Sequence, residues 1–181
     1  MSDVFFEEMR NEIFNGVNEH GHPFRTISLA TVGHNAIPRL CTVVLREVTN
    51  DLKLTFYTDS RSQKISNLML NDQIGLLMYH PHKLLQIKVE GQAHIVKDVE
   101  RLKDTWNNIQ PNSRRDYITQ HSPSSKITNP STIEYLNDGH YFTMIDVVPQ
   151  KIEFLKLKRP HHIRIAFEKK QDTWSSTFLV P

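Results

Sequence analysis

The feature that most limits the fold is a series of short β-type runs with little helix between them. Five such runs occur before residue 97, and one short helical pattern, at 62–70, separates the third from the fourth. A parallel doubly wound sheet needs regular alternation of strand and helix, so this order argues against one. Short antiparallel strands favour a sheet closed on itself, with helices outside. The five runs are 24–32, 40–48, 52–58, 74–80 and 84–96.

Helical patterns precede and follow these runs. Apolar side chains at Phe6, Met9, Ile13 and Val17 recur at helical spacing and predict a helix over 3–19. We also expect helices over 98–109 and 113–121, an irregular loop over 122–131, one or two helical turns over 132–139, and strands at 141–157, 162–168 and 174–180. The expected fold is one domain over residues 1–181, mainly β with flanking helices, in which 1–20 form a helix packed on an antiparallel barrel.

Composition and charge exclude several classes of function. With 38% hydrophobic and 23% charged residues the chain can bury a core, and its net charge of +2 argues against a nucleic-acid binder. No apolar run approaches the roughly 20 residues of a membrane span. The first 16 residues are too acidic for a secretory signal, and Cys41 alone cannot form an intrachain disulfide. We therefore expect a cytoplasmic protein that binds neither nucleic acid nor membrane.

The stretch LTFYTDSRSQK, residues 54–64, combines a strand end with groups that bind anions. A helix that begins near Ser62 presents unpaired backbone N–H groups and partial positive charge, which suit a phosphate. Hydroxyls at Thr58, Ser60 and Ser62 and charges at Arg61 and Lys64 add to this. An ordinary capped helix with a solvated turn would look the same, so these residues alone leave both interpretations open.

Six segments in order extend this pattern. They are TVVLR (42–46), FYTDSRSQK (56–64), NDQIGLLMYHP (71–81), LLQIKVEGQA (84–93), IEFLKL (152–157) and WSSTFLVP (174–181). From about residue 24 to the C-terminus, the chain resembles the pyridoxamine 5′-phosphate oxidase-like family of FMN-binding split barrels. The resemblance implies a homodimer with FMN in a groove between two chains.

The resemblance also implies roles for single residues. The FMN phosphate would lie at the start of the short helix, and the flavin ring would lie along the strand of residues 40–48. Arg46 occupies a position near flavin and substrate, where a cation favours a reduced flavin. No residue is assigned as the catalytic acid or base. The implied cofactor residues are Thr42, Val43, Val44, Arg46, Tyr57, Thr58, Ser62, Gln63, Lys64 and Gln86.

Departures from the family pattern affect both the cofactor site and the substrate site. Arginine is usual where Cys41 stands, and Gln63 replaces the arginine of a Ser-Arg-Lys motif. A tryptophan that commonly covers the flavin is replaced by Leu155. The family's Tyr, Arg and Ser at spacing four and four become Tyr117, His121 and Ser125. We therefore expect a related flavoprotein whose substrate is not pyridoxine phosphate.

The remaining candidates favour ordinary structural roles. His80, His82, His161 and His162 form no known ligand motif, so we expect turn or surface histidines and no metal site. Cys41 is expected to be a small packed side chain.

Two other functions stay open beside an FMN-dependent oxidoreductase that acts on a small-molecule substrate or electron donor. The first is a non-catalytic flavin- or haem-binding protein or stress-response protein, with any haem ligated by a surface histidine. The second is a structural barrel without cofactor. The loop 110–131 is the expected source of residues from the second chain.

Overall fold

The computed structural model describes residues 2–171 and 173–181. Its eight strands form one antiparallel sheet in the order β3-β2-β1-β4-β5-β6-β7-β8, and an additional β3–β6 pairing closes the first six into a barrel. This is the predicted split barrel. The strands are β1 (Thr26–Val32), β2 (Pro38–Val48), β3 (Leu54–Asp59), β4 (Gln73–His80), β5 (Leu85–Ile95), β6 (Phe142–Lys156), β7 (Ile163–Lys170) and β8 (Thr173–Leu179).

Alternation of side chains determines which face of each strand enters the barrel. In β4, Ile74, Leu76 and Met78 are buried, whereas Leu77 and Tyr79 between them are exposed. Successive side chains of a strand point to opposite faces, so the buried set fills the barrel and the other set lies on its outer surface. In β5 the same period buries every second residue from Leu85 to Ala93.

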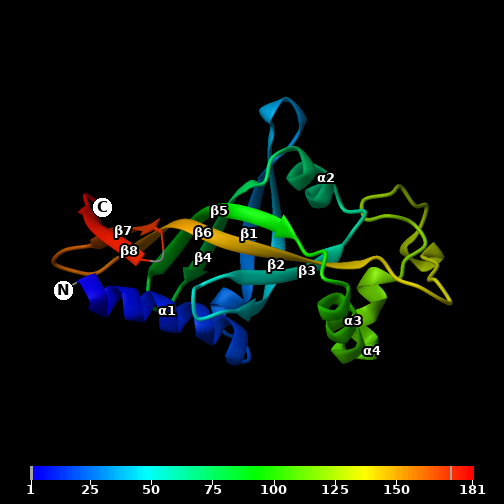
Figure 1. Ribbon diagram of the computed structural model, residues 1–181, viewed down its shortest axis with the longest axis horizontal. Coiled ribbons are helices and arrows are strands. Elements are labelled where there is room, and N and C mark those ends of the chain that lie inside the picture. Colours follow the sequence, from blue (N-terminus) through cyan, green and yellow to red (C-terminus); the bar gives the residue numbers. More distant parts are fainter. Residues whose placement is uncertain (1, 172) are drawn as a thin grey trace.

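The N-terminal helix α1 (Ser2–Asn18) packs against the barrel, as predicted. Met9 and Ile13 are fully buried in the main core cluster, and Phe6 contacts Phe167 of β7 with ring centroids 5.2 Å apart. A short 3₁₀ turn, η1 (Pro23–Arg25), then leads into β1, so Phe24 lies in this turn and not in the predicted strand. Figure 1 shows α1 lying alongside the barrel.

Two further helices lie at the other end of the molecule from the β7–β8 hairpin (Figure 1). They are α3 (Val99–Asn108) and the single turn α4 (Pro111–Arg114), while α2 (Gln63–Leu70) follows β3. The predicted helix over 113–121 is wrong beyond its first residues. The chain forms the 3₁₀ turn η3 (Arg115–Tyr117) and then an isolated bridge from Thr119 to Tyr135.

The segment 132–139 is also not helical as predicted, apart from Thr132 at the end of the 3₁₀ turn η4 (Pro130–Thr132). A further 3₁₀ turn, η2 (His34–Ala36), joins β1 to β2. Helices long and apolar enough to cross a membrane are absent from residues 2–171 and 173–181.

Candidate functional site

Three of the implied residues meet where β3 ends and α2 begins. The Nζ of Lys64 donates a hydrogen bond to Thr58 Oγ1 at 3.0 Å, and the hydroxyls of Thr58 and Ser62 lie 3.2 Å apart. Ser62 occupies the N-cap position of α2, yet its hydroxyl makes no capping hydrogen bond. In the part of the chain that the structure describes, no carboxylate pairs with Lys64. This corner therefore combines one cation, two hydroxyls and the positive end of a helix, all suited to a phosphate.

Arg61 does not belong to this group, although the sequence suggested that it would add charge there. Its guanidinium binds both oxygens of Asp59, with Nη2–Oδ2 at 2.7 Å, and donates to the carbonyl of Thr119 at 2.9 Å. It also lies 3.3 Å from the ring centroid of Tyr141. Arg61 thus attaches the 119–121 segment to the end of the barrel, and its charge is neutralised. Gln63 is exposed and donates to Asn67 of its own helix at 3.3 Å.

The side chains of β2 divide between the two faces of the sheet. Thr42 is exposed and Val44 and Arg46 are half-buried, whereas Val43 and Leu45 are buried in the barrel core. Strand alternation turns the Val43 side chain into the barrel core, away from the outer face on which the flavin is expected. Its backbone alone remains available to a ligand on the outer face. Cys41 packs against the core, as predicted.

A pocket of about 820 Å³ opens between β2, β3 and helix α3. Its lining includes two implied residues, Arg46 and Tyr57. The Arg46 guanidinium lies 5.3 Å from the Tyr57 ring centroid, and its Nε is buried without a hydrogen-bond partner among the described residues. A buried N–H group that lacks an acceptor is costly. The Arg46 side chain as a whole lines the pocket and brings a positive charge to it.

One wall of the pocket is an ion-pair network that the sequence analysis did not find. Arg101 of α3 donates to Asp146 of β6, with Nη1–Oδ2 at 2.6 Å, and to Glu47 Oε2 at 3.0 Å. Thr55 also donates to Asp146, at 2.6 Å. Burial alone would raise the pKa of Asp146, but the hydrogen bonds from Arg101 and Thr55 outweigh it and lower that pKa.

Tyr57 is held in its neutral form by the same wall. Its hydroxyl donates to Glu47 Oε1 at 3.1 Å. Burial, followed by the negative charge of Glu47, raises the pKa of Tyr57 to about 12. The phenol is therefore a hydrogen-bond donor and not a base at neutral pH.

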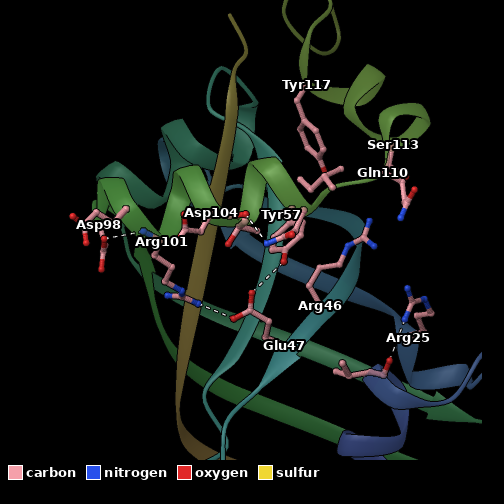
Figure 2. Close-up of a pocket in the computed structure, with 15 residues that line it drawn as sticks. Arg25, Arg46, Glu47, Tyr57, Asp98, Arg101, Asp104, Gln110, Ser113 and Tyr117 are labelled. Carbon is pink, nitrogen blue, oxygen red and sulfur yellow. Dashed lines mark hydrogen bonds and ion pairs between the residues drawn. The ribbon is translucent and has the colours of Figure 1, made fainter.

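The opposite side of the pocket is positively charged. Figure 2 shows Arg25 and Arg46 on this side, with Gln110 and Ser113 beside them and Arg101 at the far end against Glu47. Within residues 2–171 and 173–181, neither Arg25 nor Arg46 forms an ion pair. Arg25 lies far in the sequence from Gln110 and Ser113, and no motif links it to them. The uncompensated charge suits a ligand with a phosphate or carboxylate group.

The three residues at the family's substrate spacing do not all line the same pocket. Tyr117 is buried and lines the pocket. His121 is exposed, and together with Ser125 it lines a separate, smaller hollow in the 119–134 segment. Within one chain, the segment 110–117 therefore contributes Gln110, Ser113 and Tyr117 to this pocket, whereas His121 and Ser125 lie outside it.

Gln86 lies apart from the other implied residues. It is in β5, opposite Tyr79 of β4 and Leu155 of β6. Strands β1 and β4 separate β2 from β5 on one side of the closed barrel, and β3 and β6 separate them on the other, so Gln86 and Val44 lie on opposite sides of the barrel. One chain does not bring Gln86 and Val44 to the same point.

One of the four histidines expected in turns or at the surface differs from that expectation, whereas His82, His161 and His162 are exposed. His80 is buried, 8% exposed, and not a surface side chain. Its imidazole lies with the buried His22 and Glu12, and one potential ligand atom from each of the three is within 4.8 Å of the others.

The corner at Lys64 and the outer face of β2 match different parts of FMN, namely its phosphate and its ring. The corner at Lys64 offers donors for a phosphate, and the outer face of β2 offers a flat strand surface for a ring. Arg46 Nε, buried and without an acceptor, lies in the pocket near that surface. These groups fit FMN in chemical type, although the usual arginine at position 41 is a cysteine.

Comparisons with known proteins agree with this description. The family model described as "Pyridoxamine 5′-phosphate oxidase, FMN-binding domain" matches residues 5–97. A pyridoxine/pyridoxamine 5′-phosphate oxidase of Thermosynechococcus vestitus is 24% identical over 97% of this chain and 88% of its own length. One of Acinetobacter baumannii is 28% identical over 88% of this chain and 79% of its own length.

Solved structures share the fold. An FMN-binding protein from Nostoc punctiforme, described as pyridoxamine 5′-phosphate oxidase-related, superposes with a TM-score of 0.78 at 20% identity, over 97% of this chain and 96% of that one. PhzG from Burkholderia lata, in complex with tetrahydrophenazine-1-carboxylic acid, gives 0.77 at 20% identity, over 99% and 91%.

Proposed function

The chain belongs to the pyridoxamine 5′-phosphate oxidase FMN-binding family, and from this premise we propose that it is an FMN-dependent oxidoreductase acting on a small anionic substrate. The observation that carries the proposal is the corner at the start of α2. There Lys64 has no carboxylate partner among the residues that the structure describes and lies 3.0 Å from the Thr58 hydroxyl, beside a Ser62 hydroxyl that makes no capping hydrogen bond. A structural turn has no need of an unpaired cation there, whereas a phosphate does.

Lys64, Ser62 and Thr58 would bind the FMN phosphate. The outer face of β2, with Thr42, Val44 and the Val43 backbone, would support the ring. Bound FMN would supply hydride and electron transfer, which no side chain of this protein can supply. The protein itself would bind, orient and partly shield the reacting groups.

The substrate would bind in the pocket beside Arg46. Arg46 and Arg25 lack ion-pair partners among the described residues, so an anionic group would neutralise them. Tyr57 would donate a hydrogen bond, because its pKa of about 12 keeps it protonated. The relatives' names specify phosphate esters and the PhzG complex contains a carboxylic acid, and two arginines suit either group.

We propose that the protein acts as a homodimer. The outer face of the sheet exposes Leu40 (75%), Leu77 (42%) and Tyr79 (49%), which a second copy would cover. Gln86 is too far from Val44 to serve the same flavin within one chain, but a Gln86 from the second copy would reach it across such an interface. Residues of the 110–131 loop would complete the groove.

The test is a spectrum followed by a reduction. We expect the purified protein to retain FMN, seen as a flavin absorbance band, and NADH or NADPH added without air to bleach it. Pyridoxine 5′-phosphate, pyridoxamine 5′-phosphate and aromatic carboxylic acids would then be tested under air, with hydrogen peroxide as the readout. A protein that binds no flavin at micromolar concentration would contradict the proposal.

A second candidate function is flavin or haem binding without turnover. The position of His121 and Ser125 outside the pocket favours it, because the family's substrate spacing is then incomplete. A yellow protein that neither nicotinamide nor any tested substrate reduces would support this function. A haem absorbance band in place of the flavin band would support the haem version.

A further inference from the structure

A buried polar cluster lies beneath the N-terminal helix, away from the flavin site. Glu12 of α1, His22 before η1 and His80 at the end of β4 are 6%, 8% and 8% exposed. His22 Nε2 lies 3.3 Å from Glu12 Oε2, and Lys83 Nζ binds Glu12 Oε1. The His82 ring centroid is 6.2 Å from that of His80. The cluster thus joins α1, the start of β1 and the turn after β4.

Backbone contacts determine where the imidazole protons lie. The amide of Phe24 donates to His22 Nδ1 at 3.1 Å, and the amide of Lys83 donates to His80 Nδ1 at 3.3 Å. A nitrogen that accepts a hydrogen bond carries no proton, so each neutral ring has its proton on Nε2. His22 therefore donates to Glu12, and the carboxylate receives a second donor from Lys83.

These tautomers argue against a metal ion at the cluster. A metal held by Nε2 needs the proton on Nδ1, where it would face the backbone N–H group that now donates to that atom. A metal held by Nδ1 would displace the same amide. Lys83 also places a positive charge on the carboxylate that would have to be a ligand.

The cluster is connected to the candidate substrate pocket. His22 is the N-cap of the turn Pro23–Arg25, and its side chain accepts from the Phe24 amide. Arg25, at the end of that turn, donates from Nη1 to the carbonyl of Val17 at 3.3 Å. Val17 and Arg25 both line the 820 Å³ pocket. The same few residues therefore attach α1 to the barrel and hold Arg25 in the pocket.

We propose that Glu12, His22, His80 and Lys83 form a proton-sensitive clamp, in which His22 is the positioning residue that fixes α1 and the Arg25 turn against the barrel. The effect on substrate rests on the proposed function, whereas the clamp itself does not. A second proton on His80 would have to sit on Nδ1, opposite the backbone N–H group of Lys83. Protonation of His80 would therefore break the contact with Lys83 and loosen the clamp.

The pKa of His80 is lowered in the folded protein, as expected if protonation of His80 opposes the closed clamp. Burial lowers it, and the charges of Lys83, His22 and His82 lower it further, against the opposing effect of Glu12. A histidine whose pKa is lower in the folded state stabilises that state fully above the unfolded value of about 6.5, and this contribution is lost as the pH falls below it. The clamp is accordingly closed at pH 8 and loosens in mild acid.

Hydrogen–deuterium exchange of the full-length protein tests the clamp without any ligand. His22→Asn keeps an acceptor for the Phe24 amide but no longer reaches Glu12. Lys83→Gln changes an exposed side chain and leaves the core unaltered. His20→Asn, exposed and two residues away, is the matched control. At pH 8 we expect exchange of residues 2–25 to rise about tenfold in His22→Asn and Lys83→Gln, and not in His20→Asn.

Wild-type protein should show the same rise between pH 8 and pH 5.5, after correction for intrinsic exchange, and His22→Asn should show little further change. Unchanged exchange in both clamp variants would overturn the proposal. So would one equivalent of zinc retained by the wild type and lost in His80→Gln, because the cluster would then be a metal site.

Steady-state kinetics test separately whether the clamp acts on the substrate pocket. The probe is the phosphate ester or aromatic carboxylic acid that releases hydrogen peroxide fastest in the assay proposed above. With it, His22→Asn and Arg25→Gln should each raise the apparent KM about fivefold at unchanged kcat and flavin content, and the double variant should add little. A full additional fivefold loss in the double variant would show that His22 does not act through Arg25. An inactive wild type would count against the proposed function alone, because the exchange experiment needs no substrate.

Discussion

Lys64 donates a hydrogen bond to Thr58 across the turn from β3 to α2, with Nζ and Oγ1 3.0 Å apart. Its neighbour Arg61 is bound to Asp59, so Lys64 provides the unpaired charge of this corner among the described residues. Thr58 and Lys64 are six positions apart in the sequence, and the strand-to-helix turn brings them together.

Reversing that charge should remove the cofactor while leaving the fold intact. For Lys64→Glu we expect FMN affinity to fall at least 100-fold, because a phosphate would then face a carboxylate instead of a cation. FMN fluorescence quenching measures the affinity, and circular dichroism checks the fold. Lys158→Glu, an exposed lysine near the β7–β8 hairpin, is the control and should bind normally. Normal binding by Lys64→Glu would mean that the phosphate lies elsewhere.

The ion pair between Arg101 and Asp146 should stabilise the packing of α3 on the barrel. Asp146→Asn leaves the Arg101 guanidinium without its main partner, and we expect a loss of about 2 kcal/mol in the free energy of unfolding. Urea unfolding at pH 7 measures this. Glu168→Gln, an exposed change on β7, should cost less than about 0.5 kcal/mol.

The same ion pair predicts that the stability of the protein falls in acid. Because the pKa of Asp146 is lowered in the folded state, its contribution is complete above the unfolded value of about 3.9 and is lost as the pH falls through the folded value. Between pH 5 and pH 3 the wild type should therefore lose more stability than Asp146→Asn. Parallel curves for the two proteins would contradict this assignment.

The sequence predicted the barrel because its strands obey local rules. Alternation in β4 and β5 is regular, and α2 presents Ile65 and Leu68 to the core at helical spacing. The helix over 113–121 failed because tertiary contacts outweigh its local preference. Tyr117 packs in an aromatic cluster with Phe142, and its carbonyl accepts from the amide of Tyr141 at 2.8 Å.

The sequence predicted the part of the candidate site that one continuous segment forms. It did not predict the residues that the fold brings together from distant segments. Thr58, Ser62 and Lys64 lie within seven residues, so a strand-to-helix motif was enough to find them. Arg25 and Arg101 reach the pocket from separate helical segments, and no spacing rule relates them. His80 was expected in a turn or at the surface because its spacing from His82 matches no ligand motif, but its imidazole is buried beside Glu12 of α1.

Tyr57 should make the protein sensitive to alkali. Its pKa of about 12 exceeds the unfolded value of about 10, so its contribution to stability is present below pH 10 and is lost as the pH rises toward 12. Tyr57→Phe should therefore lose less stability than the wild type between pH 10 and pH 11.5. Tyr79→Phe, at an exposed tyrosine, should follow the wild type. Urea unfolding at each pH gives the comparison.

Gly91 should be the least replaceable glycine of the barrel. It lies at the irregularity in the β5–β6 pairing, opposite Pro149, where the two backbones approach closely. A Cβ atom there would lie 3.0 Å from Pro149 Cα and still closer to the carbonyl oxygen of Val148. Both contacts are with backbone, which cannot move aside as a flexible side chain can. We expect Gly91→Ala to cost about 3 kcal/mol of unfolding free energy.

Gly75, on the adjacent strand β4, provides the matched control. A Cβ atom at Gly75 would meet nothing closer than Ala30 Cβ at 3.8 Å, an ordinary contact. Because alanine also restricts the unfolded chain, Gly75→Ala should change stability by less than about 1 kcal/mol. Thermal and urea unfolding of both variants measure the difference. Equal stability of the two variants would mean that the β5–β6 irregularity can relax, and that close backbone approach is not what requires glycine at position 91.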